Sequence, residues 1–316
     1  MIRTQSLAEF NKEVQTVVTI GTFDGVHIGH QKIIDQLVRQ AKKLGLPSVV
    51  LTFFPHPRMV LQQDSQIRML QSIDERAEKL EALGVDYLVV YPFTKEFSRM
   101  HAQDFVSEIL VHGLHAKHIL IGYDHRFGRN RNANIEDLKR YGVSFNFEVT
   151  EISAREIDAL AVSSTKIRKA LQKGDVQKAA TFLGAGYTLS GKVVSGKKIG
   201  RDLGFPTANI AVDFVHKLIP KEGVYVVRTQ WQGQEVFGML NIGQNPTVNR
   251  EENKTTTAQQ KIEVHLFDFS ADLYNQKLVI TFLTHLRAEQ KFDSLDQLKE
   301  QLKADQKKAR SFLSTL

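Results

Sequence analysis

Hydrophobic and polar residues follow different patterns in the two halves of the chain. In the first half, short apolar runs alternate with segments in which apolar residues recur every three or four positions. The short runs predict strands at residues 16–21, 46–54, 85–93, 117–124 and 143–152. The periodic segments predict helices at 29–44, 74–84 and 104–115. This alternation indicates an α/β unit with a Rossmann-like, doubly wound parallel sheet, whose ligand lies beyond the carboxyl ends of the strands.

From about Gly186 the chain changes to short runs rich in β-branched and aromatic residues, separated by turn residues. These runs lie at 187–194, 223–231, 236–243, 261–269 and 277–286. They predict a small antiparallel β-barrel, followed by one C-terminal amphipathic helix that starts near Ser294. We therefore expect two domains, at residues 1–184 and 185–316. The polar segment 249–260 is expected to be a mobile loop.

Composition narrows the class of protein. The 316 residues are 42% hydrophobic and 24% charged, which is typical of globular domains. The charged N-terminus and the lack of any apolar run of about 20 residues predict a cytoplasmic protein without a membrane partner. The absence of cysteine excludes disulfides, thiolate metal sites and a cysteine nucleophile. The net charge of +7 is spread along the chain, so we expect anionic small molecules as ligands and no nucleic-acid partner.

The stretch IGTFDGVHIGHQKII places His27 and His30 in the first turn of a predicted helix, three positions apart and therefore on one face. Glycines at 21, 25 and 29 let the backbone turn or approach a phosphate closely, and the helix N-terminus offers N–H groups to an anion. Two imidazoles beside a phosphate site fit the transfer of a nucleotidyl group, which depends on stabilising charge on the phosphates. A structural role, or a metal pair, is the alternative for such histidines.

Three later segments fit the same site. TFFPHP would form a rigid, partly aromatic wall for a flat ring, and GYDHRFGRNR follows the fourth strand; an ordinary loop is the alternative for each. VSSTKIRKAL brings hydroxyls, N–H groups and a guanidinium to a helix start, which fits a triphosphate site or a plain helix cap. The residues concerned are Phe54, His56, Pro57, Asp124, Phe127, Ser163, Ser164, Thr165 and Arg168.

A second glycine- and lysine-rich loop lies in SGKVVSGKKIGRDLGFPTANI. Its spacing is not that of a Walker loop, yet its glycines and basic residues suit phosphate, and a hydroxyl and an amide oxygen beside them suit Mg²⁺. The candidates are Gly196, Lys197, Gly200 and Arg201 for ATP, and Thr207 and Asn209 for the metal. A solvated hairpin is the alternative. Glu263 lies between two apolar residues of a predicted strand, which alone indicates only a polar strand face.

These motifs resemble those of a known family. GTFDGVHIGH resembles the HxGH signature of the nucleotidylyltransferase superfamily in its flavin-specific form, and GFPTANI resembles the riboflavin kinase signature. In order, the segments resemble the family of bifunctional riboflavin kinases/FAD synthetases, over about residues 10–183 and 187–314. The resemblance implies that the barrel converts riboflavin and ATP to FMN and ADP. It implies that the first domain then converts FMN and ATP to FAD and pyrophosphate, both steps with Mg²⁺.

The resemblance also implies a role for individual residues. His27 and His30 would be catalytic in adenylyl transfer, and Glu263 would be the base toward the ribityl hydroxyl of riboflavin. ATP in the first domain would contact Gly21, Phe23, Asp24, Gly29, Ser163, Ser164, Thr165 and Arg168, and the flavin there would contact Phe54, His56, Pro57, Asp124 and Phe127. In the barrel, Tyr274 would lie near the nucleotide, and Arg287 and Phe292 would contact the flavin.

Three segments differ from the family pattern: His125, the string RNRNAN, and FLGAGY at the predicted domain joint. One rival interpretation is a nucleotidylyltransferase for another acceptor, with a barrel that only binds. Another is a flavin- or RNA-binding regulator that has lost catalysis. Turnover rather than stoichiometric binding separates them. A homo-oligomer is compatible with the sequence.

Overall fold

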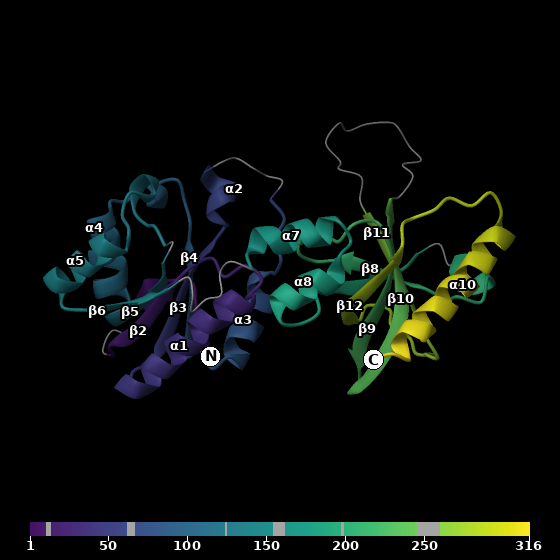
Figure 1. Ribbon diagram of the computed structural model, residues 1–316, viewed down its shortest axis with the longest axis horizontal. Helices are drawn as coiled ribbons and strands as arrows, with labels where there is room; N and C mark the ends of the chain where they lie inside the picture. The colour runs from purple at the N-terminus through teal and green to yellow at the C-terminus, as the bar shows by residue number, and fades with distance from the viewer. Residues whose placement is uncertain (11–13, 62–66, 124, 154–161, 197–198, 245–259) are drawn as a thin grey trace. The chain divides into compact units, whose positions relative to one another are not determined.

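The computed structural model describes the chain except residues 11–13, 62–66, 124, 154–161, 197–198 and 245–259 (Figure 1). The chain divides into two compact units, Met1–Ser164 and Thr165–Leu316. The loop expected at 249–260 lies outside the described residues, apart from Gln260, which begins a strand.

The first unit is a three-layer α/β structure. Its described strands form one six-stranded parallel sheet in the order β1-β4-β3-β2-β5-β6. The strands are β1 Ile2–Thr4, β2 Thr16–Ile20, β3 Ser48–Phe54, β4 Tyr87–Pro92, β5 Ala116–Gly122 and β6 Glu148–Ile152. The helices are η1 Leu7–Glu9, α1 Ile28–Leu44, α2 Pro57–Leu61, α3 Ile73–Ala82, η2 Phe97–Arg99, α4 Ala102–Asp104, η3 Phe105–Gly113, η4 Arg129–Arg131 and α5 Ile135–Phe145. The predicted doubly wound parallel sheet is confirmed.

Alternate residues of each strand face opposite sides of this sheet. Val17 and Val50 pack with the apolar face of α1 and with α3, whereas Val18 and Val49 pack with η3 and α5. Helices therefore cover both faces, with α1 and α3 on one and η3 and α5 on the other (Figure 1). Burial on both faces explains the continuous apolar runs in the sequence.

Strand β2 marks the point where the order of the sheet reverses. The chain passes from β2 to β3 and β4 on one side, and returns to β5 and β6 on the other. In open α/β sheets the ligand lies at such a point, outside the carboxyl ends of the strands. The segment that leaves the carboxyl end of β2 is the one that carries His27 and His30.

Two local predictions in this unit are wrong. The strand expected at 143–152 begins only at Glu148, because α5 continues to Phe145. A capping box between Asn134 and Asp137 fixes the start of this helix, and Asn146 ends it in the left-handed conformation. The short strand β1 was missed because it is only three residues long and pairs in parallel with β4 alone, at the sheet edge.

The second unit contains a closed barrel whose described strands follow the order β10-β11-β8-β7-β12-β9. They are β7 Thr188–Val194, β8 Ala208–Val212, β9 Gly223–Trp231, β10 Gln234–Gln244, β11 Gln260–Leu266 and β12 Lys277–Arg287. The helices are α7 Ser164–Gln172, α8 Val176–Leu183, α9 Ile199–Asp202 and α10 Leu295–Leu313. The predicted antiparallel barrel and C-terminal helix are confirmed, and β8 is a strand that the prediction lacked. Strand β8 begins within the motif GFPTANI, whose glycine, proline and asparagine are typical of a loop.

Helix α10 lies against the outside of the barrel, where an apolar cluster joins them. Val224, Met239 and Phe267 of the barrel pack with Ala309 and Leu302 of the helix. The residues that alternate with these along β10 and β11, such as Leu240 and Val264, are buried on the other face. Helix α10 therefore covers one outer face of the barrel, and polar residues on that face lie beneath it.

Helices α7 and α8 belong to the second compact unit, so that unit begins earlier than residue 185. Thr284 Oγ1 of β12 donates to Gln177 Oε1 of α8 at 3.3 Å, and the Lys221 N–H donates to the Leu171 carbonyl of α7. The division into domains at 184/185 stays a prediction. None of the described helices is both long enough and apolar enough to cross a lipid bilayer.

Candidate active sites

His27 is the N-cap of α1, and its ring orientation follows from that role. Its Nδ1 accepts a hydrogen bond from the backbone N–H of His30 at 3.3 Å. In the neutral ring the proton therefore lies on Nε2, which can act as a donor. The rings of His27 and His30 stack with centroids 3.6 Å apart, so the two imidazoles form one face at the helix N-terminus.

His30 is held in its neutral form. Burial lowers its pKa well below the ordinary value, and the neighbouring His27 and the Arg76 guanidinium lower it further. Its Nδ1 is buried and has no hydrogen-bond partner within the part of the chain that the structure describes. The Phe23 ring packs edge-on against the His30 ring, with the ring centroids 5.2 Å apart, and fixes the plane of the imidazole.

The loop that leads into α1 has a tight backbone. Phe23 and Val26 adopt positive φ angles of 47° and 38°, which non-glycine residues rarely do, and Gly25 adopts 93°. The Val26 N–H donates to the Phe23 carbonyl and closes the turn. A Cβ on Gly21 would lie 3.0 Å from the Phe23 ring, so a side chain there would push this ring aside.

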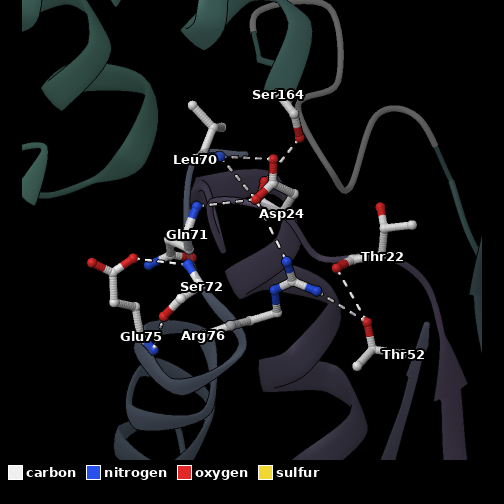
Figure 2. Close-up of polar contacts among 9 residues, drawn as sticks. All are labelled: Thr22, Asp24, Thr52, Leu70, Gln71, Ser72, Glu75, Arg76 and Ser164. Atoms are coloured by element: carbon white, nitrogen blue, oxygen red, sulfur yellow. Dashed lines mark hydrogen bonds and ion pairs between the residues drawn. The ribbon is translucent and has the colours of Figure 1, made fainter. Parts of the chain in front are cut away.

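Asp24 anchors this loop through a buried network (Figure 2). Its carboxylate, 1% exposed, accepts the backbone N–H groups of Leu70 and Gln71 at 3.0 to 3.1 Å and lies 3.6 Å from the guanidinium of Arg76. The Asp24 carbonyl accepts the Ser164 hydroxyl at 2.9 Å. The sequence suggested Asp24 as a phosphate-site residue, and its side chain here points into the protein.

The other residues suggested for this site are only partly gathered. Ser164 reaches the loop, and Ser163 precedes it half-buried; Thr165 and Arg168 belong to the second unit. Phe54 ends β3 half-buried, and the His56 Nδ1 accepts the N–H of Arg58 just beyond Pro57, which begins α2. Phe127 is 7% exposed and packs against Phe105, and Asp124 lies outside the described residues. Gly29 is buried in the first turn of α1.

In the second unit, a cavity of about 270 Å³ lies on the outer barrel face and extends to α10. Five residues suggested from the sequence line it, although up to 92 positions separate them: Gly200, Thr207, Glu263, Arg287 and Phe292. Lys261, Glu263 and His265 alternate along β11 and all face this cavity. Buried Ile262 and Val264 between them face the other way, which confirms the direction expected for Glu263.

The Glu263 carboxylate forms an ion pair with Lys261 Nζ at 2.7 Å and is about a quarter exposed. His265, two residues on, bonds through Nδ1 to the Pro206 carbonyl at 2.8 Å, so it ties β11 to the GFPTANI segment. Burial lowers the pKa of His265, which is therefore neutral near pH 7.

Asn209 of β8 lies directly opposite Glu263 in the strand register, so the two side chains project from the same face. Gly196 abuts Asn209 so closely that a Cβ on it would lie 2.0 Å from the amide nitrogen. Gly200 is equally restricted, since a Cβ would lie 2.3 Å from the Phe205 carbonyl oxygen. The glycines of this loop therefore bring bare backbone next to the suggested metal-binding oxygens.

Arg287 is fixed by Asp305 of α10. The guanidinium donates to the fully buried carboxylate from Nε and Nη2 at 2.8 to 3.0 Å, and Gln301 also donates to this carboxylate at 2.8 Å. The guanidinium carbon lies 5.8 Å from the centroid of the Phe292 ring. This bidentate pair sets the orientation of Arg287 at the wall of the cavity.

Of the remaining residues suggested for ATP in this unit, Tyr274 lies near the end of β7. Tyr274 is 40% exposed, and its neighbour Asn275 donates its N–H to the Val193 carbonyl, which places the turn beside the strand that leads to Gly196. Arg201 is exposed, and Lys197 lies outside the described residues.

Sequence reasoning missed Arg76, Lys261 and Asp305. Arg76 resembles an ordinary charged position of an amphipathic helix, and nothing local shows that it is 1% exposed. Lys261 could have been found, because it lies two residues before Glu263 and therefore on the same strand face.

The first unit is thus built as a nucleotidylyltransferase, with two imidazoles and a helix N-terminus at the switch point of a parallel sheet, and the second as a barrel with a glycine-rich segment and a carboxylate. The family model for FAD synthetase matches residues 9–166, and that for riboflavin kinase matches residues 183–313. The chain belongs to the family of bifunctional riboflavin kinase/FMN adenylyltransferases. Its function is therefore the phosphorylation of riboflavin to FMN and the adenylylation of FMN to FAD, with ATP as co-substrate.

Curated relatives of that name match over most of their length. The protein of Listeria monocytogenes is 38% identical over 305 residues, covering 96% of this chain and 94% of the relative. That of Escherichia coli K12 is 35% identical over 297 residues, covering 94% of this chain and 92% of the relative. A crystal structure named "Macrolide-efflux Protein", from Streptococcus pneumoniae, is 34% identical with a TM-score of 0.87 and covers 98% of both chains. Its fold supports the fold described here, and the family rests on the matches above.

Proposed function

We propose that the two activities occur at separate sites: adenylyl transfer at the loop that ends in His27 and His30, and phosphoryl transfer in the cavity beneath α10. The observation that carries the proposal is that Thr207, Glu263, Arg287 and Phe292 line one cavity, within a unit that is separate from the two histidines. Phosphoryl transfer to riboflavin needs a base for the ribityl hydroxyl, a surface for the flavin ring and oxygen ligands for a metal beside the phosphates, and these four residues offer all three.

In the cavity, Glu263 acts as the general base. As the ribityl oxygen bonds to the γ-phosphorus of ATP, the bond from that phosphorus to the leaving ADP oxygen breaks and the hydroxyl proton passes to the carboxylate. Lys261, at 2.7 Å, holds the carboxylate toward the cavity. Arg287 and Phe292 hold the flavin, since a guanidinium over a ring leaves a flat surface for stacking.

The donor set beside Glu263 fits Mg²⁺, which prefers hard oxygen ligands and keeps several waters. The Thr207 hydroxyl and the Asn209 amide oxygen would hold it, next to the bare backbone at Gly196. When bound, Mg²⁺ neutralises charge on the phosphates of ATP. The side chains of this unit orient the hydroxyl and accept its proton.

The Mg²⁺ assignment is tested with Asn209→Ala. We expect this variant to need on the order of tenfold more Mg²⁺ for half-maximal FMN formation. Even the loss of a residue that only orients a metal ligand lowers metal affinity by about that factor, and Asn209 is itself a suggested ligand. FAD formation from supplied FMN should keep its Mg²⁺ dependence, which makes the second activity a control within the same molecule. An unchanged Mg²⁺ requirement for FMN formation would remove Asn209 from the metal site.

At the first site, a phosphate oxygen of FMN bonds to the α-phosphorus of ATP as the bond to the leaving pyrophosphate breaks. His27 donates from Nε2 to the phosphates, and the first N–H groups of α1 add the positive end of the helix dipole. The neutral imidazole of His30 suits this role, since it offers a hydrogen-bond donor aimed at developing charge. His30 is kept neutral by its burial.

Several assignments stay predictions. They are the flavin contacts of Phe54, His56, Pro57, Asp124 and Phe127, the nucleotide contacts of Phe23, Asp24, Thr165 and Arg168, and those of Lys197, Arg201 and Tyr274. Mg²⁺ as the metal, a cytoplasmic location, the absence of nucleic-acid and membrane partners, and a homo-oligomer stay predictions as well.

A further inference from the structure

We propose that Arg76 is a positioning residue for adenylyl transfer. It fixes the backbone of the loop from Thr22 to Asp24 and thereby the positions of the two histidines that follow. The inference rests on the proposed assignment of adenylyl transfer to this loop. Arg76 lies in the first turn of α3, about 50 positions from the loop.

The Arg76 side chain is 1% exposed, and two of its contacts lead to the loop (Figure 2). Its Nη2 lies 3.6 Å from the Asp24 carboxylate, and its Nη1 donates to Thr52 Oγ1 at 3.3 Å. The Thr52 hydroxyl in turn donates to the Thr22 carbonyl at 3.2 Å. The two branches therefore reach the residues on both sides of Phe23.

Phe23 has a strained backbone, with φ of 47°. Such a conformation persists only where surrounding contacts over-determine it. Thr22 is held through its carbonyl and Asp24 through its carboxylate, so the Arg76 network fixes the backbone on either side of Phe23. The Phe23 ring in turn packs edge-on against His30.

A buried ion pair is weak evidence for stability, because its desolvation cost offsets its attraction, whereas directional bonds can specify one geometry. Asp24 is joined through its carbonyl to Ser164 as well. The network thus connects β3, the start of α3, the histidine loop and Ser164 within the first unit through Asp24 and Arg76. We infer that its purpose is to fix geometry at the phosphate site.

The guanidinium also acts on His30 by its charge. His27 and Arg76 are the charged or titratable side chains that act on that ring, and Arg76 contributes to lowering the His30 pKa, after burial and His27. Removing the guanidinium should therefore raise the His30 pKa. The acid limb of the pH profile for adenylyl transfer should then move to higher pH, which a purely structural role would not produce.

The test compares Arg76→Met and Arg76→Lys with Arg39→Met, an exposed arginine of α1 that pairs with Asp35. FAD formation from supplied FMN and FMN formation from riboflavin are measured in each variant. We expect Arg76→Met to lower the kcat of FAD formation by about 100-fold, the order of loss caused by a small misplacement, with the KM for ATP changed far less. FMN formation should stay at the wild-type rate.

Arg76→Lys keeps the positive charge, so it should give an intermediate kcat for FAD formation with the acid limb of the pH profile unmoved. Arg39→Met should match wild type in both activities.

A wild-type kcat and pH profile for FAD formation in Arg76→Met would overturn the inference. If that variant melts below the assay temperature, Arg76→Lys carries the test, and a wild-type kcat there would overturn it. His27→Ala is measured alongside: if it retains adenylyl transfer, the proposed function fails. If only the Arg76 variants retain it, the inference alone fails.

Discussion

Replacing Glu263 by glutamine is expected to lower FMN formation from riboflavin by about 100- to 10,000-fold, the contribution of a positioned general base. The amide keeps the size and hydrogen bonding of the side chain but cannot accept the proton of the ribityl hydroxyl. FAD formation from supplied FMN should stay at the wild-type rate, because Glu263 belongs to the barrel. Initial rates are measured by chromatography of the flavins, with each substrate supplied separately.

The matched control is Glu235→Gln. Glu235 lies on β10 and forms an exposed ion pair with Arg228 at 2.8 Å. Glu235→Gln therefore removes the same negative charge from the same barrel, but outside the cavity. It should form FMN at the wild-type rate. If Glu263→Gln phosphorylated riboflavin as fast as this control, the base would have to be another group.

Replacing His27 by alanine is expected to lower FAD formation from FMN by about 100- to 1,000-fold, as the loss of one donor to a charged transition state does. The change removes the Nε2 donor, the N-cap of α1 and the ring stacked on His30. FMN formation from riboflavin should be unaffected. The rates are measured with saturating ATP in the assay used for Glu263.

His112→Ala is the control, since His112 is exposed on η3 in the same unit. His27→Asn separates the lost cap from the lost donor, because asparagine is a good N-cap. We expect His27→Asn to restore the melting temperature without restoring FAD formation. Full activity in His27→Asn would show that the cap, and not the imidazole, is what catalysis needs.

The sequence predicted those features that have a local signature. Apolar runs that alternate with amphipathic segments predicted the parallel sheet, and the change near Gly186 predicted the barrel. The string GTFDGVHIGH and the string GYDHRFGRNR follow the predicted strands that form β2 and β5, and Glu263 lies on the predicted strand that forms β11, so these could be placed at a strand end or on a strand face. Thr207, Glu263, Arg287 and Phe292 were suggested separately and line one cavity.

What the sequence could not supply depends on contacts between distant residues. Asp24 resembles a ligand in GTFDGVHIGH, and only the fold shows that its carboxylate is bonded to the backbone near residue 70 and to Arg76. Asp305 resembles one more charge on a polar helix, yet it is fully buried against Arg287. In each case burial, which local patterns do not reveal, decides the role.

Mixing the two single variants tests most directly the claim that each unit carries one activity. Neither Glu263→Gln nor His27→Ala should convert riboflavin to FAD alone, since the first makes no FMN and the second cannot adenylylate it. An equimolar mixture with riboflavin, ATP and Mg²⁺ should form FAD after a lag in which FMN accumulates, because His27→Ala supplies FMN to the intact first site of Glu263→Gln. No FAD from the mixture, or wild-type FAD formation by either variant alone, would contradict the account.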